Sequence, residues 1–150
     1  MIDLELFVAL ATSLREQVRL LRPIQRLSLK ELTDEPIRWN GVLHLLQVSV
    51  EHVTDIGAHI LAGSDLGVPP NHREIIVKLG QMGILPLDFA QRIAPMTGFR
   101  NIVVHHYLTV DPEKVADILY NHLDDFEEFV LHIHSYLRRE DYIKDETQAE

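Results

Sequence analysis

Apolar residues recur every three or four positions along most of the chain, which is the spacing of one face of an amphipathic α-helix. Four long helices are predicted, over residues 3–21, 37–62, 87–106 and 112–137. Pro23 ends the first of them, and Pro95 with Gly98 is expected to bend the third. No alternating pattern typical of a strand continues beyond a few residues, so the sequence predicts an all-α protein.

Short motifs mark where further helices begin. Ser28 followed by Glu31 has the spacing of a capping box, which predicts a short helix at that point. Asn71 with Glu74 resembles a second N-cap pair, and Asp111 followed by proline is a typical helix start. We therefore expect an up-and-down antiparallel helical bundle with about four long helices and one or two short ones.

The composition limits the class of protein. A chain of 150 residues that is 46% hydrophobic and 25% charged matches one soluble globular domain, which we place at residues 1–140 with a polar tail at 141–150. The sequence has no cysteine, which excludes disulfides and thiolate metal ligands. It has no apolar run of the about 18–20 residues that cross a membrane. Asp3 and Glu5 stand where a signal peptide would be basic, so we expect a cytoplasmic protein with no membrane contact.

The charge is acidic overall but uneven. A net charge of −9 argues against a protein that coats nucleic acid non-specifically. Residues 71–107 reverse this balance, because Arg73, Lys78, Arg92 and Arg100 stand there against Glu74 and Asp88. This middle stretch is the part of the chain most favourable to an anionic ligand.

The 9 histidines raise the question of a metal site. His132 and His134 are two residues apart, so a helix directs them to different sides. His52 and His59 are seven apart, which is no chelating motif by itself. The sequence contains neither His-Glu-x-x-His nor Glu-x-x-His, the patterns of zinc peptidases and di-iron bundles. We expect scattered structural histidines, no metal and no cofactor.

The predicted helix at 37–62 carries a polar stripe beside its apolar one. Its members, each four residues apart, are Gln47, Glu51, Asp55 and His59. The stripe is either the solvated face of the helix or the lining of a polar cleft. For Asp55 the two interpretations are evenly balanced, and for the others the solvated face is favoured.

A cluster of functional side chains lies at the end of the third predicted helix: Arg100, Asn101, His105, His106 and Tyr107. Arginine binds phosphate through a planar fork, and histidine transfers protons near neutral pH. Arg100 and His105 are about 140° apart on an ideal helix, so they converge only if the helix is distorted or if two copies meet across a dimer. From the pattern alone, a purely structural role stays open.

The block Gly-Phe-Arg-Asn-Ile-Val-Val-His-His-Tyr at 98–107 resembles the signature of HepT-like proteins, the toxins of HepT/MntA toxin–antitoxin pairs in the HEPN superfamily. Arg100, His105 and Tyr107 match the Arg-x4-His-x-Tyr form of that motif. Residues 50–60 and 66–69 resemble the family's second-helix segment and the loop after it. His106 departs from the family, where an acidic or small residue is common, and adds a second histidine without breaking the motif.

The resemblance implies an α-helical homodimer in which the motifs of two subunits line a cleft at the interface. Family members are metal-independent endoribonucleases that use the ribose 2′-hydroxyl as nucleophile and leave a 2′,3′-cyclic phosphate. Carried over, His105 is the general acid and base, and Arg100 stabilises the charge on the phosphoryl oxygens. Asn101 would orient the site, and Asp55 would orient or balance Arg100 or His105.

The resemblance also implies two partners, an mRNA or tRNA substrate and a MntA-like nucleotidyltransferase antitoxin that transfers AMP to Tyr107. A bulky anion there would fill the cleft and repel RNA. Two alternatives remain. The chain could be a non-catalytic HEPN subunit that binds a nucleotide or a nucleotidyltransferase, or a helical dimer whose cluster only packs the interface.

Overall fold

The computed structural model describes residues 1–105 and 109–143, apart from the side chains of Val104 and His105. Within these residues the chain forms helices and no strand, which confirms the all-α class. The α-helices are α1 (Leu4–Leu21), α2 (Leu29–Thr33), α3 (Pro36–Gly63), α4 (His72–Gln81), α5 (Leu87–Ile93), α6 (Phe99–His105), α7 (Pro112–Asn121) and α8 (Leu123–Arg139). Two 3-10 helices, η1 (Arg22–Arg26) and η2 (Ala94–Gly98), join α1 to α2 and α5 to α6.

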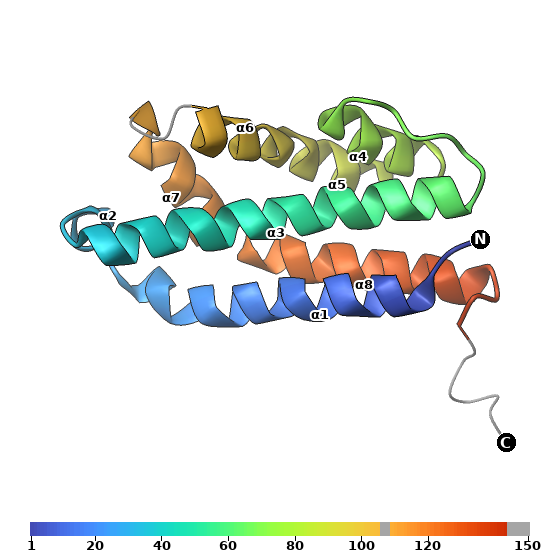
Figure 1. The fold of residues 1–150 in the computed structure, drawn as a ribbon, viewed down its shortest axis with the longest axis horizontal. Coiled ribbons are helices and arrows are strands. Elements are labelled where there is room, and N and C mark those ends of the chain that lie inside the picture. Colours follow the sequence, from blue (N-terminus) through green and yellow to red (C-terminus); the bar gives the residue numbers. More distant parts are fainter. Residues whose placement is uncertain (106–108, 144–150) are drawn as a thin grey trace, which may run out of the picture.

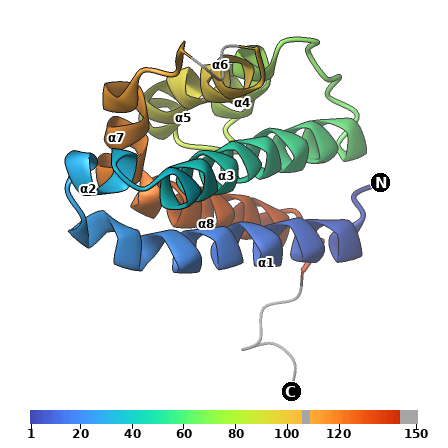
Figure 2. The same ribbon diagram turned by 60° about the vertical axis from the view of Figure 1, so that its left-hand side comes forward.

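The helices run up and down the long axis of the molecule, as expected (Figure 1). The central element is α3, the longest helix at 28 residues. It packs against α1 and α8 on one side and against α4 and α6 on the other (Figure 2). Because α3 contacts both layers, a residue on its surface can meet either the α1 layer or the α4–α6 layer. No described helix is both long and apolar enough to cross a membrane.

The predicted helix starts are confirmed by their caps. The Ser28 hydroxyl accepts a hydrogen bond from the Glu31 backbone N–H, and the Glu31 carboxylate accepts one from the Ser28 N–H, which completes the capping box. Asn71 caps α4 by accepting from the N–H groups of its second and third residues. Asp111 caps α7 by accepting from the N–H of Glu113.

The single helix predicted over 112–137 was wrong, because the chain breaks at His122 between α7 and α8. The backbone of His122 leaves the helical region, with φ −123° and ψ 5°. Its ring Nδ1 lies 2.7 Å from Oδ2 of Asp125, in the first turn of α8. The apolar residues of both helices face the same core, so the hydrophobic pattern gives no sign of the break. The bend predicted at Pro95 and Gly98 is confirmed as η2.

A glycine lets α4 lie close to α3. A Cβ atom at Gly57 would stand 3.0 Å from the side chains of both Ile75 and Leu79 on α4. A side chain larger than hydrogen would therefore push the two helices apart. This close packing holds the first turn of α4 beside η2, and so beside the start of α6.

Candidate functional site

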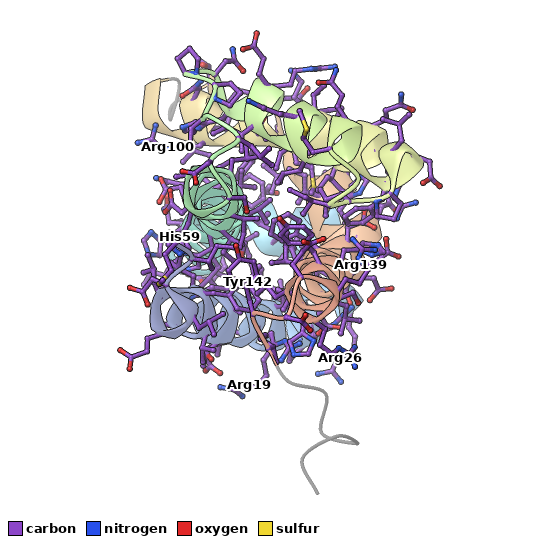
Figure 3. All side chains as sticks on the ribbon, turned by 90° about the vertical axis from the view of Figure 1, so that its right-hand side faces the viewer. Arg19, Arg26, His59, Arg100, Arg139 and Tyr142 are labelled. Atoms are coloured by element: carbon purple, nitrogen blue, oxygen red, sulfur yellow. The ribbon has the colours of Figure 1, made fainter. Side chains whose placement is uncertain are left out.

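Arg100 is the second residue of α6, directly after the bend at η2. Its Nε donates a hydrogen bond of 2.9 Å to Oε1 of Glu51 on α3. The two side chains are 39% and 30% exposed, so the pair lies at the surface with one side against the protein. Figure 3 shows Arg100 beside α3, on the opposite side of the molecule from Arg19 and Arg26.

Glu51 is held ionised by its neighbours. Burial raises the pKa of its carboxyl, but hydrogen bonds from Gln47 and Arg100 and the positive charge of Arg100 outweigh that effect and lower the pKa overall. The Gln47 amide donates to the same oxygen, Oε1, at 3.2 Å. Glu51 therefore fixes the Nε edge of the guanidinium. The terminal nitrogens of Arg100 make no hydrogen bond to any side chain in the described part of the chain, and they carry four further N–H donors.

A cavity of about 480 Å³ opens beside Arg100. Its walls come from the first turn of α4, from η2 and from the start of α6; the residues are Pro70, Asn71, His72, Arg73, Pro95, Thr97, Gly98, Arg100 and Asn101. Arg100 and Asn101 of the sequence cluster thus line one hollow, together with a second arginine, Arg73. None of the described residues in its walls is a carboxylate. A cavity of this size, with convergent donors and no anionic wall, suits a phosphate-bearing ligand.

The carboxylate beside Arg100 is Glu51, whereas the expectation from the sequence singled out Asp55, one turn further along α3. Asp55 is exposed and makes no ion pair with Arg100. At the far end of the same polar stripe, the His59 ring accepts a hydrogen bond from the Asp3 N–H at 2.9 Å. Residues four apart turn by about 40° on a helix, so this stripe winds away from α6 along its length. Glu51 belongs to the polar stripe predicted from the sequence. Which member of that stripe meets Arg100 depends on how far α6 is shifted along α3, and the sequence does not show that shift.

The remaining residues of the sequence motif are described only in part. His105 is the last residue of α6, and its side chain lies outside the described structure. His106 and Tyr107 also lie outside the described residues. The helix is regular from Phe99 to His105, so the backbone positions of Arg100 and His105 remain about 140° apart around its axis. The roles expected for His105, His106 and Tyr107 stay predictions.

Other histidines take structural positions. The His52 ring packs between α3 and α1, with Nε2 2.8 Å from the Ser13 hydroxyl. Its Nδ1 is buried without a hydrogen-bond partner, and burial lowers the pKa of the ring. His122 bridges Asp117 and Asp125 at the break before α8. Over residues 1–105 and 109–143, no group of three or more His, Asp or Glu side chains is arranged to hold a metal ion.

Comparisons with known proteins agree with this architecture. Residues 14–133 match the model of the family described as Ribonuclease HepT-like. The chain is 32% identical over 91 residues to the mRNA nuclease HepT of Shewanella oneidensis, covering 61% of this chain and 68% of that protein. It is 36% identical over 93 residues to the tRNA nuclease HepT of Aphanizomenon flos-aquae, covering 62% and 63%. The aligned segments thus span about two thirds of each relative.

The fold has a solved counterpart. The tri-AMPylated Shewanella oneidensis HEPN toxin, in complex with MNT antitoxin, superposes with a TM-score of 0.79 at 24% identity, covering 90% of this chain and 99% of that one. This likeness shows a shared HEPN fold. Together with the family match over most of the sequence, it establishes that the chain belongs to the ribonuclease HepT-like family.

Proposed function

We propose that this protein is the endoribonuclease toxin of a toxin–antitoxin pair, with Arg100 and His105 as its catalytic residues. The observation that carries the proposal is the Arg100–Glu51 pair, which fixes a guanidinium beside a cavity with no carboxylate among its described lining residues, on the helix that ends at His105. The nuclease relatives support the activity, and the solved toxin in complex with its antitoxin supports the pairing.

The proposed reaction needs no metal ion. The ribose 2′-oxygen attacks the adjacent phosphorus and loses its proton, while the bond from phosphorus to the 5′-oxygen of the next nucleotide breaks. The products are a 2′,3′-cyclic phosphate and a 5′-hydroxyl, so one proton leaves the 2′-oxygen and one reaches the 5′-oxygen. His105 carries these protons. Arg100 binds the phosphoryl oxygens through its terminal nitrogens and stabilises their developing charge.

Two copies of the chain form the proposed active unit. The backbone positions of Arg100 and His105 lie about 140° apart around the axis of α6, so we infer that one helix alone does not bring both groups to the same phosphate. In a homodimer the motifs of two subunits face one another across a cleft, and Arg100 of one copy can act with His105 of the other. Asn101 and His106 belong to the same cleft, where Asn101 orients the site by hydrogen bonding.

Tyr107 is the proposed site of control. A nucleotidyltransferase antitoxin of the MntA type transfers AMP to its hydroxyl. The added nucleotide places negative charge two residues from His105, where it repels an RNA phosphate and occupies the cleft. The tri-AMPylated state of the related toxin supports this proposal.

The test uses the chain expressed without a partner and incubated with total cellular RNA in the presence of EDTA. We expect cleavage by the parent and none by His105→Ala or Arg100→Ala. Cleavage by both variants would remove these residues from the mechanism. If the parent does not cleave and its intact mass shows no adduct on Tyr107, the non-catalytic nucleotide-binding subunit becomes the better account.

A further inference from the structure

The four basic residues between positions 71 and 107 have different surroundings. Arg92 forms ion pairs with Asp125 and Glu128 on α8, both at 3.1 Å. Lys78 donates to the backbone carbonyls of the loop before α4. Two of the four are therefore committed to structural contacts. Arg73 and Arg100 are the two that line the 480 Å³ cavity.

Arg73 and Arg100 reach this cavity from different helices. Arg73 is the second residue of α4, and Arg100 is the second residue of α6. Arg73 is exposed and forms no ion pair with any residue that the structure describes. Arg100 already has a counter-charge in Glu51, so Arg73 is the arginine of this hollow without an ion-pair partner among the described residues, and a bound anion would supply one.

The charge of this cavity differs from that of its neighbours. A second hollow of about 380 Å³ shares Pro95 and Gly98 with it and has a mixed lining, with Glu113 and Asp117 beside Arg92 and Lys114. A third, beside α5, includes Glu128 in its lining. In a chain of net charge −9, a cavity whose described lining holds two arginines and no carboxylate favours an anion, even though Glu51 pairs with one of them.

The donors at the start of α4 are already used. The Asn71 side chain accepts from the backbone N–H groups of Arg73 and Glu74, so the helix terminus itself offers little to a ligand. An anion in this cavity is recognised by side chains, above all by the Arg73 guanidinium. Arginine suits a phosphodiester because its planar fork matches two phosphate oxygens.

We propose that Arg73 binds a phosphate of the RNA strand next to the one that Arg100 contacts, which makes the α4–α6 cavity a subsite for the substrate backbone. This inference rests on the proposed ribonuclease function. Arg73 holds the strand in register and takes no part in bond breaking. It therefore contributes to the binding of RNA and not to the chemical step.

The test measures binding and cleavage separately. A short fluorescent RNA with 2′-O-methyl groups lacks the nucleophile, so its binding can be followed across a range of salt concentrations. Arg73→Gln removes the charge and keeps a polar side chain. Arg26→Gln, on the opposite side of the molecule, is the matched control because it also changes the net charge by one (Figure 3). Arg73→Lys keeps the charge but loses the planar fork.

One phosphate contact on a single strand contributes about 0.7 to the slope of log K against log salt, which corresponds to about fivefold in affinity near 0.1 M salt. We expect Arg73→Gln to reduce the slope by about 0.7 and to weaken RNA binding by about fivefold. Arg73→Lys should be intermediate, and Arg26→Gln should bind like the parent. On cleavable RNA, Arg73→Gln should raise KM about fivefold with kcat unchanged. Circular dichroism and Tm confirm that the variant is folded.

The outcomes separate this inference from the nuclease proposal. If the parent cleaves RNA and Arg73→Gln binds and cleaves like the parent, the subsite is overturned and the nuclease stands. If the parent never cleaves but binds the methylated RNA through Arg73, the nuclease fails and the backbone site stands. Equal losses in Arg73→Gln and Arg26→Gln would mean that only the overall charge matters, which also overturns the subsite.

Discussion

The Nε of Arg100 on α6 lies 2.9 Å from Oε1 of Glu51 on α3, so the orientation of the proposed catalytic arginine is set by a different helix of the bundle. Because the pair is half-exposed, its contribution to stability is small, about 0–1 kcal/mol. We expect its main effect to be the orientation of the terminal nitrogens of Arg100. We therefore expect Glu51 to act as a positioning residue for Arg100.

We expect Glu51→Gln to lower kcat by about tenfold or more, because small displacements of a charge-stabilising group are costly to the chemical step. The Tm should fall by no more than about 4 °C. Single-turnover RNA cleavage and a thermal melt measure the two effects. Asp55→Asn is the matched comparison, and a larger loss of kcat in that variant would make Asp55 the partner of Arg100. Since the pKa of Glu51 is lowered, the ion pair persists at neutral pH and is lost as pH falls through that lowered pKa.

His52 should make the fold sensitive to mild acid. Burial lowers the pKa of its ring below 6.5, so the unfolded chain binds a proton at a pH where the folded chain does not. The stability that depends on a neutral His52 ring is therefore fully present above about pH 6.5. It is lost as pH falls through the pKa of this ring in the folded protein. We expect the drop in Tm between about pH 8 and pH 5.5 to be smaller in His52→Gln than in the parent. His44→Gln, at an exposed position on the same helix, should leave the drop unchanged, and an equal drop in all three proteins would contradict the assignment.

Two glycines should respond to alanine with opposite signs. A Cβ at Gly80 on α4 would stand 2.7 Å from the Cβ of Ala90 on α5, so Gly80→Ala must displace one helix. Overpacking of this kind costs about 1–3 kcal/mol, of which better helix propensity recovers about 1. At Gly41 a Cβ meets no atom within 4 Å, so Gly41→Ala should stabilise the protein by about 0.5–1 kcal/mol. Urea unfolding measures both, and a stabilised Gly80→Ala would show that α4 and α5 pack more loosely.

The nearly buried Asp125 should matter far more than its neighbour Asp124. Asp125 accepts from Arg92 at 3.1 Å and lies 2.7 Å from the ring nitrogen of His122, which ties α5 to the break before α8. Hydrogen bonds to charged groups contribute about 1.5–3 kcal/mol, so Asp125→Ala should cost at least about 2 kcal/mol. Asp124 is 87% exposed and pairs only at the surface, so Asp124→Ala should cost under about 1 kcal/mol. Similar free energies of unfolding for the two variants would refute this ranking.

The sequence predicted the helices well where local chemistry decides them. The caps at Ser28, Asn71 and Asp111 act through side chains two or three residues from the groups that they bind, so their pattern is readable from the chain alone. The break at His122 was missed because α7 and α8 bury their apolar faces in the same core. A change of direction that keeps the same face inward leaves the hydrophobic period intact.

The candidate site was predictable only in part, because some of its contacts join helices that lie far apart in the sequence. The motif identified Arg100 and Asn101, and the charge count identified residues 71–107 as the basic stretch. Neither the motif nor the charge count could identify Glu51 as the partner of Arg100, because that contact depends on the position of α6 along α3. Nor could they bring Arg73 to Arg100, since the packing of α4 on α3 at Gly57 sets that proximity.

The unbroken length of α3 bears on which changes of chain length the protein can tolerate. One residue inserted or deleted after Glu51 turns everything beyond it by about 100°, so Gly57 would leave α4 and His59 would leave Asp3. The loop at 64–71 is less constrained than α3, because α4 is held on α3 by its own packing and the contacts of Lys78 reach only Leu66 and Gly67. Insertions and deletions among relatives should therefore collect in that loop and be absent from the second half of α3.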